Sequence, residues 1–132
     1  MNRQETKPDF KKMFMECFFE EASELSGFLI EGLMNLRIHP EDRLLLDRIC
    51  TSSHSITGAA EQVGLQNIAD FASKIKTILF KIKKEELPTD AKTLNTVLDA
   101  CSKLHHLVAD ESLTYQLEQL ISTTPTDTAD RN

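Results

Sequence analysis

The chain has 132 residues, of which 40% are hydrophobic and 27% are charged, and its formal net charge is −6. This length favours one domain with a core large enough to fold alone, and it leaves no room for an ATP-binding domain beside a second module. Four glycines, four prolines, one tyrosine and no tryptophan argue against a β-sandwich or barrel. The acidic balance argues against nucleic acid as a partner, because phosphate backbones are bound by basic faces.

The apolar runs are only a few residues long, far short of the roughly 20 residues needed to span a bilayer. The polar start MNRQETKPDF has no apolar signal core, so we expect a cytoplasmic protein without a membrane segment. Cys17, Cys50 and Cys101 form no CxxC pair, and the histidines lack metal-ligand spacing with them. We therefore expect three free thiols and no metal site.

Apolar residues recur at helical spacing along most of the chain, and proline or glycine interrupts them at intervals. This pattern predicts a flexible start over residues 1–9, four main helices, a short fifth helix and a disordered tail. The four main helices are expected at about 10–36, 41–63, 65–84 and 90–109, the short helix at 111–121, and the tail at 122–132. Asp9 is a candidate N-cap of the first helix, and Gly64 is a candidate C-terminal residue of the second.

Each main helix carries one apolar stripe, and the connections between them are short. Helices of this kind form an antiparallel four-helix bundle. We therefore predict an all-α fold over residues 10–121, in which the long first helix packs beside the other three. The short C-terminal helix is expected to cap one end of the bundle.

His54 lies in the middle of the second predicted helix. The stripe expected to face the core consists of Leu45, Ile49, Ser52, Ile56, Ala59 and Val63. At 100° per residue, His54 is rotated about 200° from Ile56, so its ring is predicted to point away from the core. Cys50, Thr51, Thr57 and Gly58 lie one turn away and are expected on the same face. Glycine inside a helix costs about 1 kcal/mol relative to alanine, and here it leaves space beside the ring for another protein.

The run Ser53-His54-Ser55-Ile56-Thr57-Gly58-Ala59-Ala60 resembles the phosphorylation motif of the histidine-phosphotransfer (HPt) family, A-H-[ST]-[LI]-K-G-[AS]-[AS]. The chain is most similar to the HPt domain that begins chemotaxis-type histidine kinases. The resemblance covers roughly residues 14 to 110 in order and spacing. The other residues that carry it are Phe18, Glu20, Glu21, Glu24, Pro40-Glu41-Asp42, Val63-Gly64-Leu65 and Ile68.

The resemblance implies a phosphocarrier of two-component signalling that has no ATP site or cofactor of its own. His54 would accept a phosphoryl group and exchange it with aspartates of response-regulator receiver domains, and a histidine kinase would be a further partner. Imidazole is largely neutral and nucleophilic at neutral pH, which suits this role. The receiver partner would supply the Mg²⁺. Domains of this kind are mostly monomers, so a monomer is expected.

Three positions depart from the family pattern. The family's lysine after the histidine is Thr57 here, and alignment of the third helix puts Ser73 and Lys76 where kinase-attached members place a histidine and a glutamate. A lysine has only donors and cannot fix the imidazole tautomer as a glutamate does. The chain is thus better suited to a free relay than to rapid phosphorylation by an attached kinase. Lys76 either replaces the missing cation or is a solvated lysine, and the Thr57 hydroxyl either donates to the phosphoryl group or is inert.

Two alternatives to a free carrier remain open. The loss of the family's lysine and glutamate fits a degenerate HPt bundle that acts as an unphosphorylated adaptor. The second alternative is that the chain is the excised N-terminal HPt domain of a chemotaxis-type kinase. An independent enzyme is disfavoured, because the sequence has no Gly-rich phosphate loop and no nucleophile–base pair.

Overall fold

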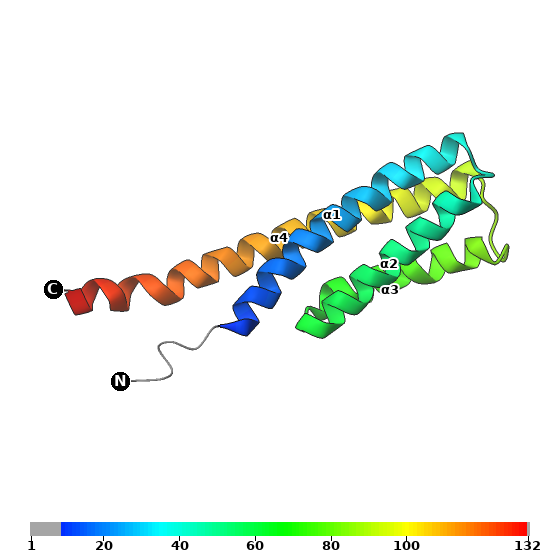
Figure 1. Cartoon of the computed structure of the whole chain (residues 1–132). Helices are drawn as coiled ribbons and strands as arrows, with labels where there is room; N and C mark the ends of the chain where they lie inside the picture. The colour runs from blue at the N-terminus through cyan, green and yellow to red at the C-terminus, as the bar shows by residue number, and fades with distance from the viewer. Residues whose placement is uncertain (1–8, 132) are drawn as a thin grey trace.

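Four helices and no strand make up the part of the chain that the structure describes. The structure is a computed structural model that describes the backbone of residues 9–131 and the side chains as far as Thr123. The helices are α1 (Phe10–Ile38), α2 (Arg43–Val63), α3 (Gln66–Lys83) and α4 (Ala91–Arg131) (Figure 1). The predicted all-α fold is confirmed, whereas residues 1–8 of the predicted flexible start lie outside the described residues.

Aspartate side chains cap three of the four helix starts. The carboxylate of Asp9 accepts a hydrogen bond from the backbone N–H of Lys12 at 3.0 Å, so Asp9 is the N-cap of α1 as predicted. Asp42 caps α2 and Asp90 caps α4 in the same way. The second helix therefore begins at Arg43, two residues later than predicted. Gly64 closes α2 with φ +79°, a left-handed conformation that favours glycine.

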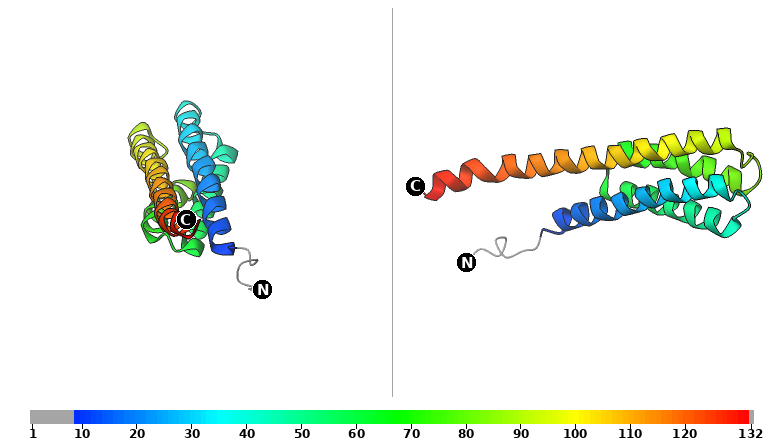
Figure 2. Two further views of the ribbon diagram at one scale, coloured as in Figure 1. Left: turned by 90° about the vertical axis from the view of Figure 1, so that its left-hand side faces the viewer. Right: turned by 90° about the horizontal axis from the view of Figure 1, so that it is seen from above.

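The helices form a ring in which each helix packs closely on its two neighbours, while the backbones of the diagonal pairs stay apart. α1 packs on α2 and α4, and α3 packs on the same two helices from the opposite corner (Figures 1 and 2). Each helix runs antiparallel to the next in the chain. The core inside the ring is aliphatic, with Leu29, Leu33, Leu46, Ile49, Ile56, Ile68, Leu79, Ile82, Leu94 and Leu104 among its fully buried side chains.

The C-terminal part of the chain corrects the prediction of a separate fifth helix. α4 is continuous from Ala91 to Arg131, with no break between residues 109 and 111. No glycine or proline lies between Pro88 and Pro125, so nothing in the backbone interrupts the helix. The apolar stripe changes face near residue 109, but the helix does not end there. The helix also continues beyond residue 121, where the tail was predicted to begin, although Asn132 and the side chains of residues 124–131 lie outside the described residues.

The far part of α4 extends beyond the turn that joins α2 to α3 (Figures 1 and 2). We call residues 110–123 of α4 the overhang. Its neighbour is the N-terminal part of α1, where the rings of Phe19 and Tyr115 lie 5.8 Å apart. The overhang therefore has α1 on one side and lacks the cover that α3 gives to the rest of α4.

The buried face of α2 is broader than predicted and is centred on different residues. Its buried side chains are Leu46, Ile49, Cys50, Ser53, Ile56, Thr57 and Ala60. The predicted stripe members Leu45, Ser52, Ala59 and Val63 are only partly buried. A helix in the ring packs against two neighbours, so its buried arc spans the faces toward both α1 and α3. The predicted stripe described the arc toward α1 alone.

Candidate functional site

His54 projects from the middle of α2 into solvent, as predicted. Its neighbours in sequence, Ser53 and Ile56, are buried at 1% and 0% exposure, which fixes the rotation of the helix beneath the ring. Within the part of the chain that the structure describes, the imidazole has no hydrogen-bond or ion-pair partner. Both ring nitrogens are thus open to an incoming group.

Gly58 lies one turn after His54 and is exposed. A Cβ placed on this glycine would meet nothing within 4 Å. Packing inside the bundle therefore does not require glycine at this position, although glycine lowers the stability of a helix. The absence of a side chain leaves the surface beside the ring low and open.

Thr57 and Cys50 do not share the exposed face of His54, which corrects the prediction. Thr57 is 2% exposed, and its hydroxyl donates a hydrogen bond to the carbonyl oxygen of Ser53 at 2.8 Å. Cys50 is 1% exposed and faces α3, where its Sγ lies 3.5 Å from the carbonyl oxygen of Leu79. Both residues lie on the arc that α3 covers. The hydroxyl of Thr57 is already used within the helix in this structure.

Contacts between α2 and α3 set how the two antiparallel helices are aligned. Cys50 contacts Leu79, and the guanidinium of Arg43 donates to the carbonyl oxygen of Lys83 at 2.7 Å. The Lys83 ammonium lies 3.3 Å from the Asp47 carboxylate, a pairing that the sequence did not reveal because it depends on this alignment. Counting along both helices from these contacts puts His54 level with about Ile75.

Ser73 and Lys76 therefore lie near the level of His54, on the arc of α3 that faces α2 and solvent. Both are partly buried. The backbone carbonyl of Ser73 accepts a hydrogen bond from the Thr77 hydroxyl. Lys76 forms no ion pair among the described residues, so its ammonium is available to an anion near His54.

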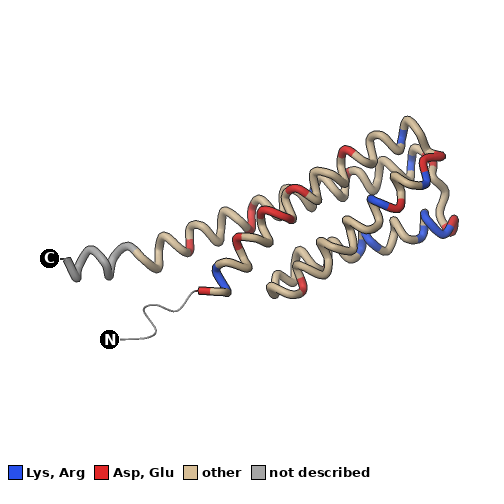
Figure 3. The backbone as a smooth tube through the Cα atoms, viewed as in Figure 1, with Lys and Arg blue, Asp and Glu red and all other residues tan. Residues whose placement is uncertain are grey.

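Charge is distributed unevenly around the site (Figure 3). Between Asp70 and Glu85, α3 and its end carry five lysines and no acidic residue: Lys74, Lys76, Lys81, Lys83 and Lys84. Acidic residues instead gather on α1, which carries Glu16, Glu20, Glu21, Glu24 and Glu31. Of these lysines, Lys76 lies on the arc toward α2 near the level of His54, so an anionic group that approaches His54 meets a positive charge on that side.

Burial raises the pKa of the Cys50 thiol and raises that of Cys101 to about 12, while Cys17 is an exposed free thiol. Residues 9–123 contain no group of three or more metal-ligating side chains. No helix in the described part of the chain is both long and apolar enough to cross a membrane.

Comparison with known proteins gives one family and several relatives. The family model of the Hpt domain matches residues 13–123. The chain is 26% identical to the chemotaxis protein CheA of Listeria monocytogenes over 96 residues, which is 73% of this chain and 16% of the relative. It is 30% identical over 84 residues to the sensor histidine kinase CheAY of Helicobacter pylori, covering 64% of this chain and 10% of the relative.

A third relative, the chemotaxis protein CheA of Rhizobium meliloti, is 28% identical over 92 residues, which is 70% of this chain and 12% of the relative. The chain thus spans only 10% to 16% of the length of these three proteins. No solved structure matches the chain.

Proposed function

Because the chain belongs to the Hpt domain family, a family of histidine phosphotransfer domains, we propose that it is a phosphocarrier in which His54 accepts the phosphoryl group and exchanges it with receiver-domain aspartates. One observation carries this proposal. His54 is an exposed imidazole without a partner in the described chain, on a helix anchored by buried neighbours, beside the open surface at Gly58. A protein that must present its nucleophile to another protein needs this kind of open site.

The transfer step follows from the chemistry of a neutral imidazole. The ring nitrogen that carries the lone pair attacks the phosphorus atom of an aspartyl phosphate in line with the bond to the aspartate oxygen. The N–P bond forms as that P–O bond breaks, and the aspartate leaves as a carboxylate. Transfer to a second receiver reverses the step, so the carrier is regenerated unchanged.

Lys76 is the residue of α3 best positioned to assist the transfer. The alignment of α2 with α3 puts it near the level of His54, and its ammonium has no partner among the described residues. A positive charge there offsets the charge on the phosphoryl oxygens and takes over the task of the lysine that Thr57 replaces. Lys76 also distinguishes this chain from kinase-attached members, which favours a free relay as its role.

The partner supplies the rest of the catalytic groups in this proposal. Phosphoryl transfer depends on in-line positioning and on neutralisation of charge more than on covalent assistance. The receiver brings its acidic site and the Mg²⁺ bound there, and a histidine kinase or a phosphorylated receiver is the donor. The basic helix α3 favours approach of such an acidic surface.

Phosphate labelling tests the proposal. The wild-type chain, His54→Gln and the control His106→Gln, which alters an exposed histidine of α4, are incubated with a phosphorylated receiver. Wild type and the control are expected to gain phosphate that is labile in acid and stable in base, and His54→Gln none. Label that persists in His54→Gln would show that another residue is the acceptor.

A second set of donors separates the alternatives. Phosphorylated receivers are compared with the kinase core of a chemotaxis-type histidine kinase supplied with ATP. Faster labelling by receivers supports a free relay, whereas faster labelling by the kinase core supports the role of a kinase's own HPt domain. If no donor labels the wild-type chain, the chain is an unphosphorylated adaptor and not a phosphocarrier.

A further inference from the structure

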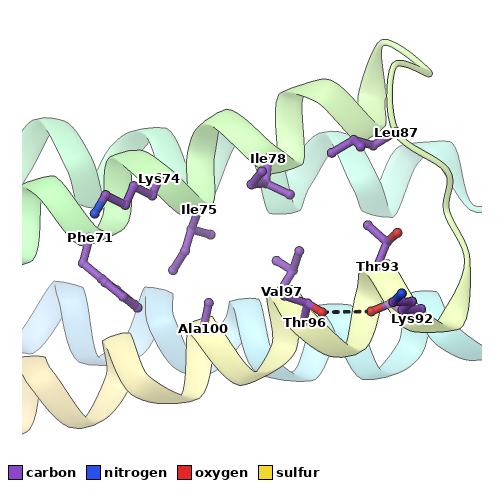
Figure 4. A pocket seen from close by; sticks show the side chains of 10 residues that line it. All are labelled: Phe71, Lys74, Ile75, Ile78, Leu87, Lys92, Thr93, Thr96, Val97 and Ala100. Carbon is purple, nitrogen blue, oxygen red and sulfur yellow. Dashed lines mark hydrogen bonds between the residues drawn. The ribbon is translucent and has the colours of Figure 1, made fainter.

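A groove of about 450 Å³ runs along the seam between α3 and α4 (Figure 4). Its walls are apolar, with Phe71, Ile75 and Ile78 from α3 facing Val97 and Ala100 from α4. The charged groups that line it are the ammonium groups of Lys74 and Lys92, and no carboxylate is among its lining residues. In a chain with net charge −6, this seam is locally basic and apolar.

The overhang of α4 has the opposite character. Leu113, Leu117 and Ile121 follow one another at intervals of four residues and are 56%, 51% and 71% exposed. The only charged residues of the overhang are Asp110, Glu111 and Glu118, and it has no lysine or arginine. Large apolar side chains exposed in a row on a helix are typical of a surface that another protein covers. The overhang thus matches the groove in apolarity and complements it in charge.

The two surfaces also lie at matching distances along α4. A two-fold axis that crosses α4 near Leu107 pairs residues equally far on either side of that point. In an antiparallel pair of α4 helices, Leu117 of one copy then lies level with Val97 of the other, and Ile121 lies level with Thr93. Both of these levels fall inside the groove.

The second helix that forms the groove does not obstruct this pairing. The ammonium of Lys103 lies 5.7 Å from the ring centre of Phe71, which sets the level of α3 against α4. Counting back from Phe71, α3 begins at about the level of Leu107. The first residue of each α3 therefore lies near the two-fold axis, and each α3 runs away from the axis. The α3 helices of the two copies do not overlap, and the overhang of the second copy can enter the groove.

The geometry points to a two-fold dimer in which the overhang of each copy docks in the α3–α4 groove of the other. This arrangement buries both exposed apolar surfaces at once and leaves each facing a partner of opposite charge. It replaces the monomer that the family resemblance implied. His54 lies on α2, which contributes no residue to the groove, so the phosphocarrier site remains open in the dimer.

One ion pair between copies follows from the same alignment. Asp110 is exposed on the overhang, and the pairing about Leu107 puts it level with Leu104, next to Lys103 of the second copy. The Asp110 carboxylate forms no ion pair in the described part of its own chain. An Asp110–Lys103 contact occurs twice in the dimer because of the two-fold symmetry.

Molar mass in solution tests the dimer, measured by light scattering and sedimentation over a wide range of concentrations. Wild type is expected to dimerise, and Leu117→Glu and Thr96→Glu are each expected to be monomeric with unchanged helix content, because each adds a carboxylate at an exposed position of the contact. Leu44→Glu is the matched control, since Leu44 is exposed on α2, and it is expected to dimerise like wild type. A wild-type chain that is monomeric throughout would overturn the proposal, and the exposed row Leu113, Leu117 and Ile121 would then need a different partner.

Charge reversal tests the alignment itself. Lys103→Glu and Asp110→Lys are each expected to weaken dimerisation at least severalfold, because each opposes two like charges. The double variant restores the opposite signs and is expected to recover most of the loss. If the double variant is no stronger than the single ones, the two residues do not face each other and the proposed alignment is wrong.

Discussion

The hydroxyl oxygen of Ser26 lies 2.7 Å from Nδ1 of His105, and this hydrogen bond joins α1 to α4. Ser26 is fully buried, and its hydroxyl oxygen also lies 3.2 Å from the carbonyl oxygen of Ser23. A hydroxyl has one hydrogen, so the direction of the contact with His105 depends on which ring nitrogen of His105 carries the proton.

Ser26→Ala is expected to lower the free energy of unfolding by about 1 kcal/mol, because it leaves Nδ1 of His105 without its hydrogen-bond partner. Ser23→Ala is the matched control, since Ser23 is exposed on the same helix and contributes only its backbone carbonyl. Urea unfolding measures both variants. Equal stability of the two variants would contradict a contribution from the hydrogen bond, and nitrogen NMR of His105 checks the tautomer directly.

Gly32→Ala is expected to destabilise the bundle by about 1–3 kcal/mol. A Cβ at Gly32 would lie 2.9 Å from Cγ1 of Ile49, which is fully buried where α1 meets α2. Gly27→Ala in the same helix meets nothing within 4 Å and is expected to raise stability by up to about 1 kcal/mol, since alanine favours the helix. Thermal unfolding of both variants checks the prediction, and a stabilising Gly32→Ala would show that α1 and α2 pack less closely.

Gly58→Ala separates stability from function. The added Cβ touches nothing in the chain, so the variant is expected to be more stable by up to about 1 kcal/mol. It also narrows the open surface beside His54, so phosphoryl transfer from a receiver is expected to slow. Gly27→Ala gains similar stability away from the site and should transfer at the wild-type rate. Unchanged transfer in Gly58→Ala would mean that the partner does not approach over this glycine.

Lys76→Ala is expected to slow phosphoryl transfer about five- to tenfold, which corresponds to roughly 1 kcal/mol of lost charge stabilisation in the transition state. Lys81→Ala removes an exposed lysine from the same helix, one that points away from α2, and is expected to have a much smaller effect. Rates of transfer from a phosphorylated receiver measure both. Equal rates in the two variants would identify Lys76 as a solvated lysine without a catalytic part.

The thiols are expected to react in two classes. Cys17 is exposed, whereas Cys50 and Cys101 are buried, so a thiol reagent should modify one cysteine in the native protein and three after denaturation. Burial raises the pKa of Cys101 from its ordinary 9.0 to about 12, so this thiol stays protonated in the fold while the unfolded chain ionises above pH 9. Its contribution to stability is therefore full below pH 9 and is lost as the pH rises toward 12.

Alkaline unfolding checks the second half of that expectation. Cys101→Ala removes the thiol and is expected to flatten the fall in stability above pH 9, although it costs some packing at every pH. Cys17→Ala should follow the wild-type curve, because Cys17 is exposed. A native protein in which Cys101 reacts as fast as Cys17 would show that α4 opens readily from the core.

Local signals in the sequence were sufficient for the helix count of the bundle and for most helix ends. Asp9, Gly64 and Pro88 act within a few residues of where they stand, so caps and breaks are visible without the fold. The prediction that the fourth helix ends at about residue 109 was wrong, because α4 continues to Arg131. Only the fold shows that α4 extends past α3 after about residue 109, so its apolar residues no longer have to face the core of the bundle.

The candidate site was predictable at His54 and less so around it. The exposure of His54 follows from periodicity, but the burial of Thr57 depends on α3 covering a second arc of α2. The level of Lys76 depends on contacts such as Cys50 with Leu79, which lie 29 residues apart in the chain. Periodicity within one helix contains no information on how two helices are aligned.

The turn between α2 and α3 consists of Gly64 and Leu65 alone. If the turn keeps its place against α2, one residue added to the helix just after it would rotate every later side chain of α3 by about 100° relative to His54 and shift it by about 1.5 Å along the helix. Lys76 would then point elsewhere, and the lysines of α3 would face a different direction. The two-residue turn therefore helps to determine which side chain of α3 lies beside His54.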